Sequence, residues 1–238
     1  MKTFIVIPTY NEAGNIEDLI VKIQNLRVND INILIVDDNS PDGTGDITEN
    51  LSQQNSNVFL LKRYKRKGRG SAGIDGFKYA LERGADYIIE MDADFSHDPK
   101  YIPDFLSTIK DHDVVLGSRF VKGGRDIGRG LKRQIITKLA GIYVRTLLRL
   151  KIKDVSSGYR CFKRKVFEKI DLDDMVSGGP SIVLEILYKT ISKGFTVEEI
   201  PIVFSDRRQG KTKLDYITLL ETLVMILRLR KMKKQGLL

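Results

Sequence analysis

The sequence predicts an α/β fold in which an open, mostly parallel twisted sheet is flanked by helices. Short continuous runs of Ile, Val and Leu end in polar or charged clusters at 4–8, 31–38, 57–61 and 86–94. Such runs are typical of strands that are buried on both faces, as in parallel sheets. Apolar residues spaced three and four apart fill the gaps between the runs and indicate helices. Strands that alternate with helices predict βαβ crossovers.

The remaining elements of the first half follow the same pattern. A fifth candidate strand lies at 112–119, and helical spacing covers 16–26 and 72–81. Asp98 and Pro99 begin a further helix, because proline suits the first helical position.

The pattern changes after residue 120. A basic loop with four glycines at 123–130 precedes a long apolar helix at about 131–149. A short helix near 163–169 and a helix over 181–193 come next. The segment 195–204 reads as a strand, and its internal proline, Pro201, places it at a sheet edge or a bend. With no repeat and no linker, we expect one domain over the whole chain.

Composition narrows the class of protein. The lone cysteine rules out a disulfide within the chain and suits a reducing cytoplasm. No run of 18 apolar residues occurs, so we expect no membrane-spanning helix. The formal charge of +9, from 40 basic and 31 acidic residues, favours anionic partners.

Three polar segments each follow a different predicted strand: 8–12, 37–38 and 92–94. Because ligands bind beyond the carboxyl ends of parallel strands, we expect these segments to line one crevice. Asp92 and Asp94 point to the same side of an extended backbone and suit Mg²⁺ or Mn²⁺. The alternative is a pair of turn caps. Acidic neighbours in the same crevice favour the metal.

Two further segments allow two readings. The stretch 37–44 is typical of a turn, and it also fixes a carboxylate that can accept a hydrogen bond from a base or a ribose. The basic run 62–69 most often forms a solvated face. Four cations in separate loop segments with nearby glycines are more typical of phosphate binding: Arg119, Arg133, Arg207 and Lys213.

These motifs resemble those of family 2 glycosyltransferases with a GT-A (Rossmann-like) fold, and more narrowly the dolichyl- and polyprenyl-phosphate mannose synthases. The resemblance covers nearly the whole chain. It rests on IPTYNE (7–12), VDDNSPDGT (36–44), MDADFSHDP (91–99), GSR (117–119), LKR (131–133), SSGYR (156–160) and PIVFSDRRQGKTKL (201–214).

The resemblance implies a role for each matching residue. The nucleoside would be held by Pro8, Tyr10, Glu12, Val36 and Asp38. The ribose, diphosphate and metal would lie at Asp92, Ala93 and Asp94, with Ser96 as a further metal contact. Donor and acceptor phosphates would be bound by Arg119, Arg207 and Lys213, and the acceptor-phosphate side by Arg133 and Thr137. Asp94, Arg119, Arg133 and Arg207 would be the catalytic residues.

The resemblance also implies a different function for each part of the chain. Residues 1–120 would form a nucleotide-binding half, 121–213 an acceptor half, and 214–238 an amphipathic, basic C-terminal helix. Members often carry C-terminal transmembrane helices, and this sequence contains none. Position 96 is Ser where some members have Gln, so the metal ligands differ from that pattern.

The implied reaction is transfer of mannose from GDP-mannose to a dolichyl or polyprenyl phosphate, with inversion. Mg²⁺ or Mn²⁺ and arginines would stabilise the departing nucleotide. The lipid phosphate is already anionic near neutral pH, so we expect no dedicated general base. The alternative donor is UDP-glucose or another nucleotide sugar, used with the same acceptor.

A polyprenol acceptor implies a membrane surface or a small membrane-protein partner, and a peripheral location on the cytoplasmic face. The C-terminal segment is either an interfacial anchor or a core helix with a solvated basic tail. A nucleic-acid-binding module would explain the charge but not the clustered aspartates, so we expect no nucleic acid. The intact motifs weigh against an inactive scaffold.

Overall fold

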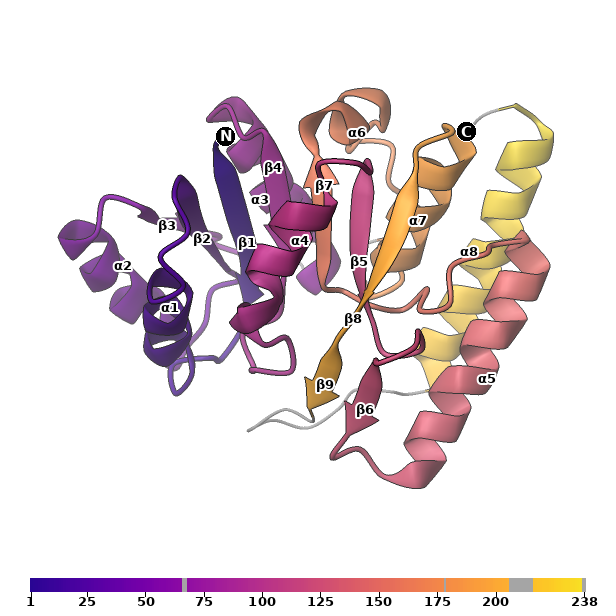
Figure 1. Cartoon of the computed structure of the whole chain (residues 1–238), viewed down its shortest axis with the longest axis horizontal. Coiled ribbons are helices and arrows are strands. Elements are labelled where there is room, and N and C mark those ends of the chain that lie inside the picture. The colour runs from indigo at the N-terminus through magenta and orange to yellow at the C-terminus, as the bar shows by residue number, and fades with distance from the viewer. Residues whose placement is uncertain (66–67, 178, 206–215, 237–238) are drawn as a thin grey trace.

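The centre of the molecule is a seven-stranded sheet with strand order β3-β2-β1-β4-β7-β5-β8 (Figure 1). The structure is a computed structural model that describes residues 1–65, 68–177, 179–205 and 216–236, with the backbone alone for 216–223. In sheet order the strands are Val58–Lys62, Ile31–Asp37, Thr3–Thr9, Tyr87–Glu90, Arg160–Lys163, Val114–Ser118 and Val197–Pro201.

The sheet is mostly parallel, as the sequence predicts. The pairs β1–β2, β1–β4, β2–β3 and β5–β8 are parallel. The exception is β7, which lies antiparallel between β4 and β5. The sequence does not reveal β7, because this strand has four residues and is charged at both ends.

Helices cover both faces of the sheet, which explains the continuous apolar runs. Along β1, Ile5 and Ile7 face one cluster while Phe4 and Val6 face the other. The first cluster includes α1 (Ile16–Gln24) and α4 (Ile102–Thr108), with α2 (Thr44–Gln54) at its edge. The second includes α3 (Arg69–Glu82), α5 (Leu131–Leu148), α6 (Arg164–Lys169), α7 (Ile182–Ser192) and α8 (Tyr216–Lys234).

The predicted strand at 195–204 is divided by its proline. Pro201 ends β8, an edge strand, and the chain continues as β9 (Val203–Ser205). This strand pairs with β6 (Arg125–Ile127) in a separate two-stranded sheet. The expected edge and the expected bend are therefore both present. They bring the loops after β5 and β8 together below the main sheet (Figure 1).

The C-terminal helix α8 packs beside α5 and α7. Met225, Ile226 and Leu229 are buried in the core, whereas the basic residues from Arg228 to Lys234 are exposed. The described turns of α8 therefore match the second predicted alternative, a core helix with a solvated basic tail. Among the residues that the structure describes, no helix is both long enough and apolar enough to cross a membrane.

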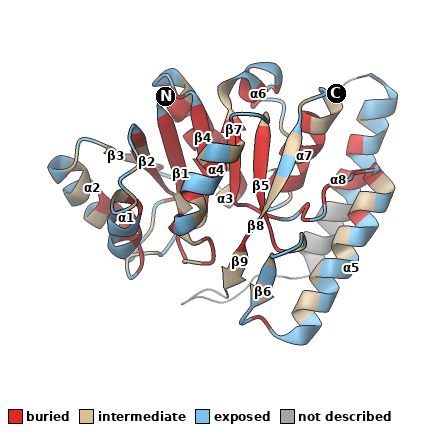
Figure 2. Ribbon diagram, viewed as in Figure 1, coloured by how far each residue is buried: buried red, intermediate tan, exposed pale blue. Residues whose placement is uncertain are grey.

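Helix α5 has an unusual distribution of exposed residues. Figure 2 shows it mostly exposed, beside a sheet that is mostly buried. Only Val144 and Leu148 of its residues are buried. The exposed positions are largely apolar: Leu131, Ile135, Ile136, Leu139, Ile142 and Tyr143. An amphipathic helix of a water-exposed protein normally has the opposite arrangement.

Candidate active site

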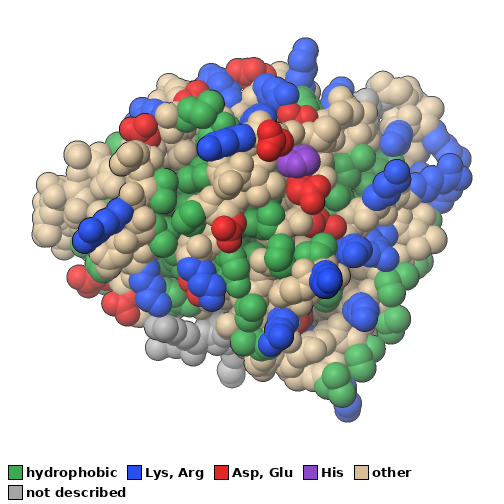
Figure 3. All heavy atoms as spheres, in the orientation of Figure 1, with side chains coloured by type: hydrophobic (Ala, Val, Ile, Leu, Met, Phe, Trp, Pro, Cys, Tyr) green, Lys and Arg blue, Asp and Glu red, His purple; other side chains and the backbone are tan. Residues whose placement is uncertain are grey.

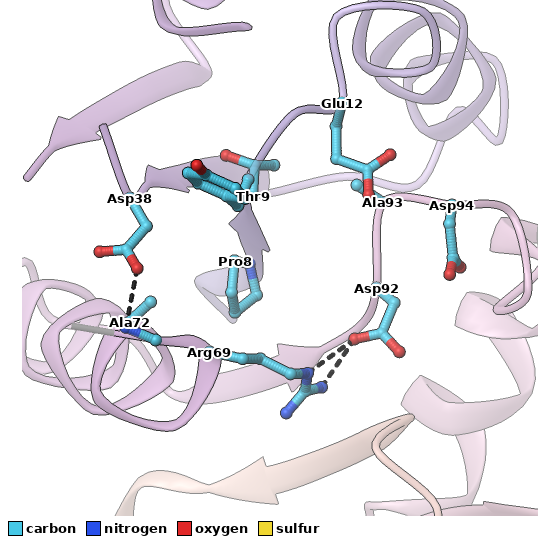
Figure 4. Close-up of a pocket in the computed structure, with 11 residues that line it drawn as sticks. Pro8, Thr9, Glu12, Asp38, Arg69, Ala72, Asp92, Ala93 and Asp94 are labelled. Atoms are coloured by element: carbon cyan, nitrogen blue, oxygen red, sulfur yellow. Dashed lines mark hydrogen bonds and ion pairs between the residues drawn. The ribbon is translucent and has the colours of Figure 1, made fainter. Parts of the chain in front are cut away.

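A cavity of about 230 Å³ lies at the carboxyl ends of β1, β2 and β4 (Figure 4). Its wall contains residues from all three of the predicted polar segments, so their convergence is confirmed. The lining is Pro8, Thr9, Tyr10, Glu12, Asp38, Gly68, Arg69, Ala72, Asp92, Ala93 and Asp94.

Asp38 is fixed at one end of this cavity. Its carboxylate accepts hydrogen bonds from Arg63 Nη1 (2.7 Å) and from the backbone N–H of Gly68 (2.8 Å). Only 3% of Asp38 is exposed. The neighbouring Asp37 accepts from the N–H and hydroxyl of Ser40, which confirms the turn. The turn thus holds Asp38 facing the cavity.

Arg69 is a wall residue that sequence reasoning missed. Its guanidinium donates twice to Asp92 Oδ1, from Nε at 2.9 Å and from Nη2 at 2.7 Å. Its Nη1 donates to the buried Glu90 at 3.1 Å. The interpretation of 62–69 as a solvated face is therefore wrong for Arg69, and also for Arg63, which is buried against Asp38. The available signal was the glycine on each side of Arg69 at a helix start.

The segment 156–160 approaches the same guanidinium. A Cβ on Gly158 would lie 2.8 Å from Arg69 Nη2, so any larger residue there would displace the guanidinium from its position. Two residues on, the fully buried Arg160 donates to the carbonyls of Ser157 and Val183. Burial lowers the pKa of Arg160 to about 10, so it remains charged at neutral pH. Arg160 therefore fixes the loop that carries Gly158.

His97 holds the backbone of the D-x-D segment, which is Asp92-Ala93-Asp94. Its Nδ1 accepts a hydrogen bond from the N–H of Asp92 at 2.9 Å. Burial lowers the pKa of His97, which favours the neutral imidazole that this bond requires. The ring stacks on Tyr159, with centroids 4.9 Å apart.

Asp94 faces the cavity beside Asp92 (Figure 4). Its Oδ1 accepts from the hydroxyl (2.6 Å) and the N–H (3.1 Å) of Ser96. Ser96 is buried and does not line the cavity, so its observed role is to orient Asp94. Asp94 and Asp92 thus both face the cavity, and the Asp92 carboxylate is paired with Arg69.

The donor set fits Mg²⁺ or Mn²⁺ completed by a substrate. In the described part of the chain, no three His, Cys, Asp or Glu side chains come together as a metal site. Mg²⁺ commonly takes one or two carboxylates and fills its other positions with phosphate oxygens and water. Oxygen ligands at Asp94 suit this arrangement.

Arg119 directly follows β5. It forms a buried ion pair with Asp154, through Nε and Nη2 at 2.7 Å each, and Nη2 also donates to Ser156 at 2.7 Å. Burial alone would raise the pKa of Asp154, but the hydrogen bonds and charge of Arg119 outweigh it and the pKa is lowered. The Phe204 ring lies near both groups, with its centroid 5.2 Å from the Arg119 guanidinium and 5.8 Å from the centre of the His97 ring.

The other predicted site residues lie apart from this cavity. Arg133 and Thr137 are on α5, and Thr137 lines a second cavity. Val36 was predicted to help hold the nucleoside. Its side chain has no exposed surface and belongs to the core beneath α3, so it does not reach the cavity. Arg207 and Lys213 lie outside the described residues.

The chain matches known proteins over most of its length. The model of "Glycosyl transferase family 2" matches residues 4–171. An undecaprenyl-phosphate mannosyltransferase of Micrococcus luteus is 38% identical, over 90% of this chain and 88% of that protein. A polyprenol monophosphomannose synthase of Mycolicibacterium smegmatis is 36% identical, over 90% and 81% respectively. A dolichol-phosphate mannosyltransferase of Pyrococcus furiosus is 39% identical over 97% of this chain, which spans 64% of that protein.

Solved structures share the architecture. Glucosyl-3-phosphoglycerate synthase from Mycobacterium tuberculosis, solved with Mn²⁺, uridine diphosphate and phosphoglyceric acid, superposes with a TM-score of 0.69 over 98% of this chain and 78% of that one. At 16% identity this likeness bears on the fold alone. With the family model matching residues 4–171 and relatives at 36–39% identity, the chain belongs to glycosyl transferase family 2 and has the GT-A fold.

Proposed function

We propose that this glycosyltransferase moves mannose from GDP-mannose to a polyprenyl or dolichyl phosphate, with inversion at the sugar carbon and release of GDP. The observation that carries the proposal is the cavity that joins Asp38, Asp92 and Asp94 at the carboxyl edge of the sheet. The names of the relatives support the acceptor class and the sugar.

The first half of the chain, 1–120, binds the donor in this proposal. Pro8, Tyr10, Glu12 and Asp38 hold the nucleoside, and Asp92 and Ala93 lie at the ribose and diphosphate. Asp94, oriented by Ser96, would hold Mg²⁺ or Mn²⁺. Such a cation supplies positive charge where the departing diphosphate becomes more negative. His97 and Arg69 keep the D-x-D backbone and Asp92 in place before the donor arrives.

The second half, 121–213, binds the acceptor. Arg119, at the end of the first half, is held in a fixed orientation by Asp154 and would provide a cation near the reacting phosphate. Arg133, Arg207 and Lys213 would add further positive charge. The acceptor phosphate oxygen carries its own negative charge near neutral pH, so no side chain has to remove a proton. Direct displacement by that oxygen gives a β-linked mannosyl phosphate lipid.

The test is transfer of label from GDP-mannose to the organic phase, in the presence of Mn²⁺ and a polyprenyl phosphate. We expect labelled lipid with GDP-mannose and at least about tenfold less with UDP-glucose, because the site would be built for one base and sugar. The control omits the lipid. Transfer from UDP-glucose instead would establish the alternative donor, and no lipid product from either would refute the proposal.

We further propose that the enzyme sits on the cytoplasmic surface of a membrane through α5. The outward face of this helix is apolar, and the sequence from 131 to 149 contains five basic residues and no acidic one. Figure 3 shows hydrophobic and basic side chains intermixed along the edge occupied by α5, where acidic ones are scarce. Apolar surface with flanking positive charge suits an anionic bilayer.

The membrane proposal is tested on α5 itself. The triple variant Ile135→Gln, Leu139→Gln, Ile142→Gln removes three exposed apolar side chains. It should bind vesicles containing anionic lipid at least about tenfold more weakly, since each such side chain contributes about 1.5–3 kcal/mol when fully buried. Flotation measures the binding, and Val21→Gln on the exposed surface of α1 is the matched control. Equal flotation of the triple variant and wild type would contradict the proposal, as would a dimer in light scattering that the triple variant abolishes.

A further inference from the structure

A second cavity, of about 240 Å³, lies between α5 and α7. Its wall is mostly apolar, with Ile136, Ala140, Gly141 and Val144 from α5 facing Val183 and Leu184 from α7. Among the described residues, none of this wall also lines the cavity that contains Asp94. The second cavity is therefore a separate site with a different chemical character.

The polar groups of this cavity connect it to a cation. Ser156 is in the wall, and its hydroxyl accepts a hydrogen bond from Arg119 Nη2 at 2.7 Å. Thr137 is also in the wall, one helical turn after Arg133, and its hydroxyl donates to the carbonyl of Arg133 at 2.9 Å. The Arg119 guanidinium, paired with Asp154, thus stands beside a cavity whose other lining residues are apolar except for Ser181. An amphiphile with an anionic head and an apolar tail matches this polarity.

The charged side of the cavity lies toward the D-x-D segment. The Phe204 ring is 5.2 Å from the Arg119 guanidinium and 5.8 Å from the His97 ring. His97 in turn accepts from the N–H of Asp92. A head group beside Arg119 would therefore lie near Phe204 and His97, and His97 contacts the backbone of Asp92, which faces the donor.

The opposite side continues onto the surface. Ile136 lines the cavity and is also 53% exposed, so its side chain belongs to both the cavity and the outward apolar face of α5. A tail too long for the cavity can therefore leave it along apolar surface. Pockets for drug-sized ligands are roughly 300–1,000 Å³, so a cavity of about 240 Å³ takes only the first few units of a long chain.

Gly141 has no packing role that requires glycine. A Cβ at this position would meet no atom of another described part of the chain within 4 Å, and a glycine in a helix interior is destabilising relative to alanine. What the missing side chain does provide is space, because Gly141 is part of the cavity wall.

From this polarity, the link to Arg119 and the open wall at Gly141, we infer that the cavity between α5 and α7 binds the first isoprene units of the acceptor. The inference rests on the proposed function for the identity of that acceptor. It assigns the tail to α5 and α7 and the phosphate to the side of Ser156 and Arg119.

The test fills the cavity and follows ligand binding by thermal shift, independently of turnover. Gly141→Leu places a side chain into the open space, and Gly141→Ala is the matched control. Farnesyl phosphate should raise the melting temperature of wild type and Gly141→Ala, and should leave Gly141→Leu unchanged. Inorganic phosphate should give no comparable shift in any of the three. If Gly141→Leu does not fold, Ala140→Leu fills the same cavity from the adjacent position.

Activity and donor binding separate this inference from the proposed function. In Gly141→Leu the KM for a polyprenyl phosphate should rise at least about tenfold, whereas the shift produced by GDP-mannose with Mn²⁺ should stay at the wild-type value. Polyprenyl phosphate turnover by both cavity-filling variants with unchanged KM would overturn the inference and leave the proposed function standing. The opposite outcome is that the wild type transfers no mannose to lipid, while farnesyl phosphate binds wild type and Gly141→Ala but not Gly141→Leu. That result would refute the proposed function and support the cavity assignment.

Discussion

Replacing Asp94 by Asn should abolish sugar transfer, with kcat lowered by roughly 10²–10³ or more, while the protein stays folded. Asp94 faces the cavity with 6% of its surface exposed, and it accepts hydrogen bonds from the hydroxyl and the N–H of Ser96. Asn has the same shape but carries no charge, so it cannot balance a divalent cation. The folding cost should be limited to about 1 kcal/mol, the value of an ordinary hydrogen bond.

The experiment compares turnover, Mn²⁺-dependent nucleotide binding and thermal unfolding in the same preparation. Asp98→Asn is the matched control, because Asp98 caps the short helix that begins at Pro99 and does not line the cavity. Chelation of divalent ions should reduce wild-type turnover to the level of Asp94→Asn. Near-normal turnover of Asp94→Asn in the presence of chelator would refute the assignment of the cation to this residue.

The convergence of the acidic segments was predictable because it follows from general rules. Continuous apolar runs identify strands that are buried on both faces, and parallel strands bring the residues that follow them to one edge. These two rules were enough to predict that Asp38, Asp92 and Asp94 lie close together. Even the division of the strand at Pro201 follows from the missing N–H of proline.

The parts that escaped prediction depend on partners far away in sequence. Arg69 reads as one more cation of a basic run, and only the approach of Asp92 and Glu90 shows that it belongs to the cavity wall. Val36 is the opposite case, a residue that was predicted for the site but lies outside it. It stands next to two aspartates in a site motif, but strand alternation turns its side chain into the core beneath α3.

The same limit applies to the face of α5. Apolar spacing predicted a helix there but could not tell which of its sides faces the protein, because both carry apolar residues. The structure places Arg133, Thr137 and Gly141 on the less exposed side and Ile135 and Leu139 on the exposed side. An interfacial anchor was one of two alternatives for 214–238, and the membrane contact is instead proposed at α5.

Asp154→Asn should lower the free energy of unfolding by about 3–5 kcal/mol, because it breaks a buried ion pair and leaves the Arg119 guanidinium without its counter-charge. Both side chains are almost completely buried, so water cannot replace the lost carboxylate. Denaturant unfolding measures the loss. Glu168→Gln is the matched control, since it breaks an exposed ion pair with Arg164 that should contribute less than about 1 kcal/mol.

The pH dependence provides a second readout for the same pair. The pKa of Asp154 in the folded protein is below the ordinary value of 3.8, so its contribution is complete above that value and is lost as the pH falls through the folded pKa. Wild type should therefore lose stability below about pH 4 more steeply than Asp154→Asn does. In the double variant with Arg119→Met, the loss should be smaller than the sum of the two single losses, because the second substitution removes the unpaired charge. A loss below about 1 kcal/mol for Asp154→Asn, or additive losses in the double variant, would show that Arg119 is not held by Asp154.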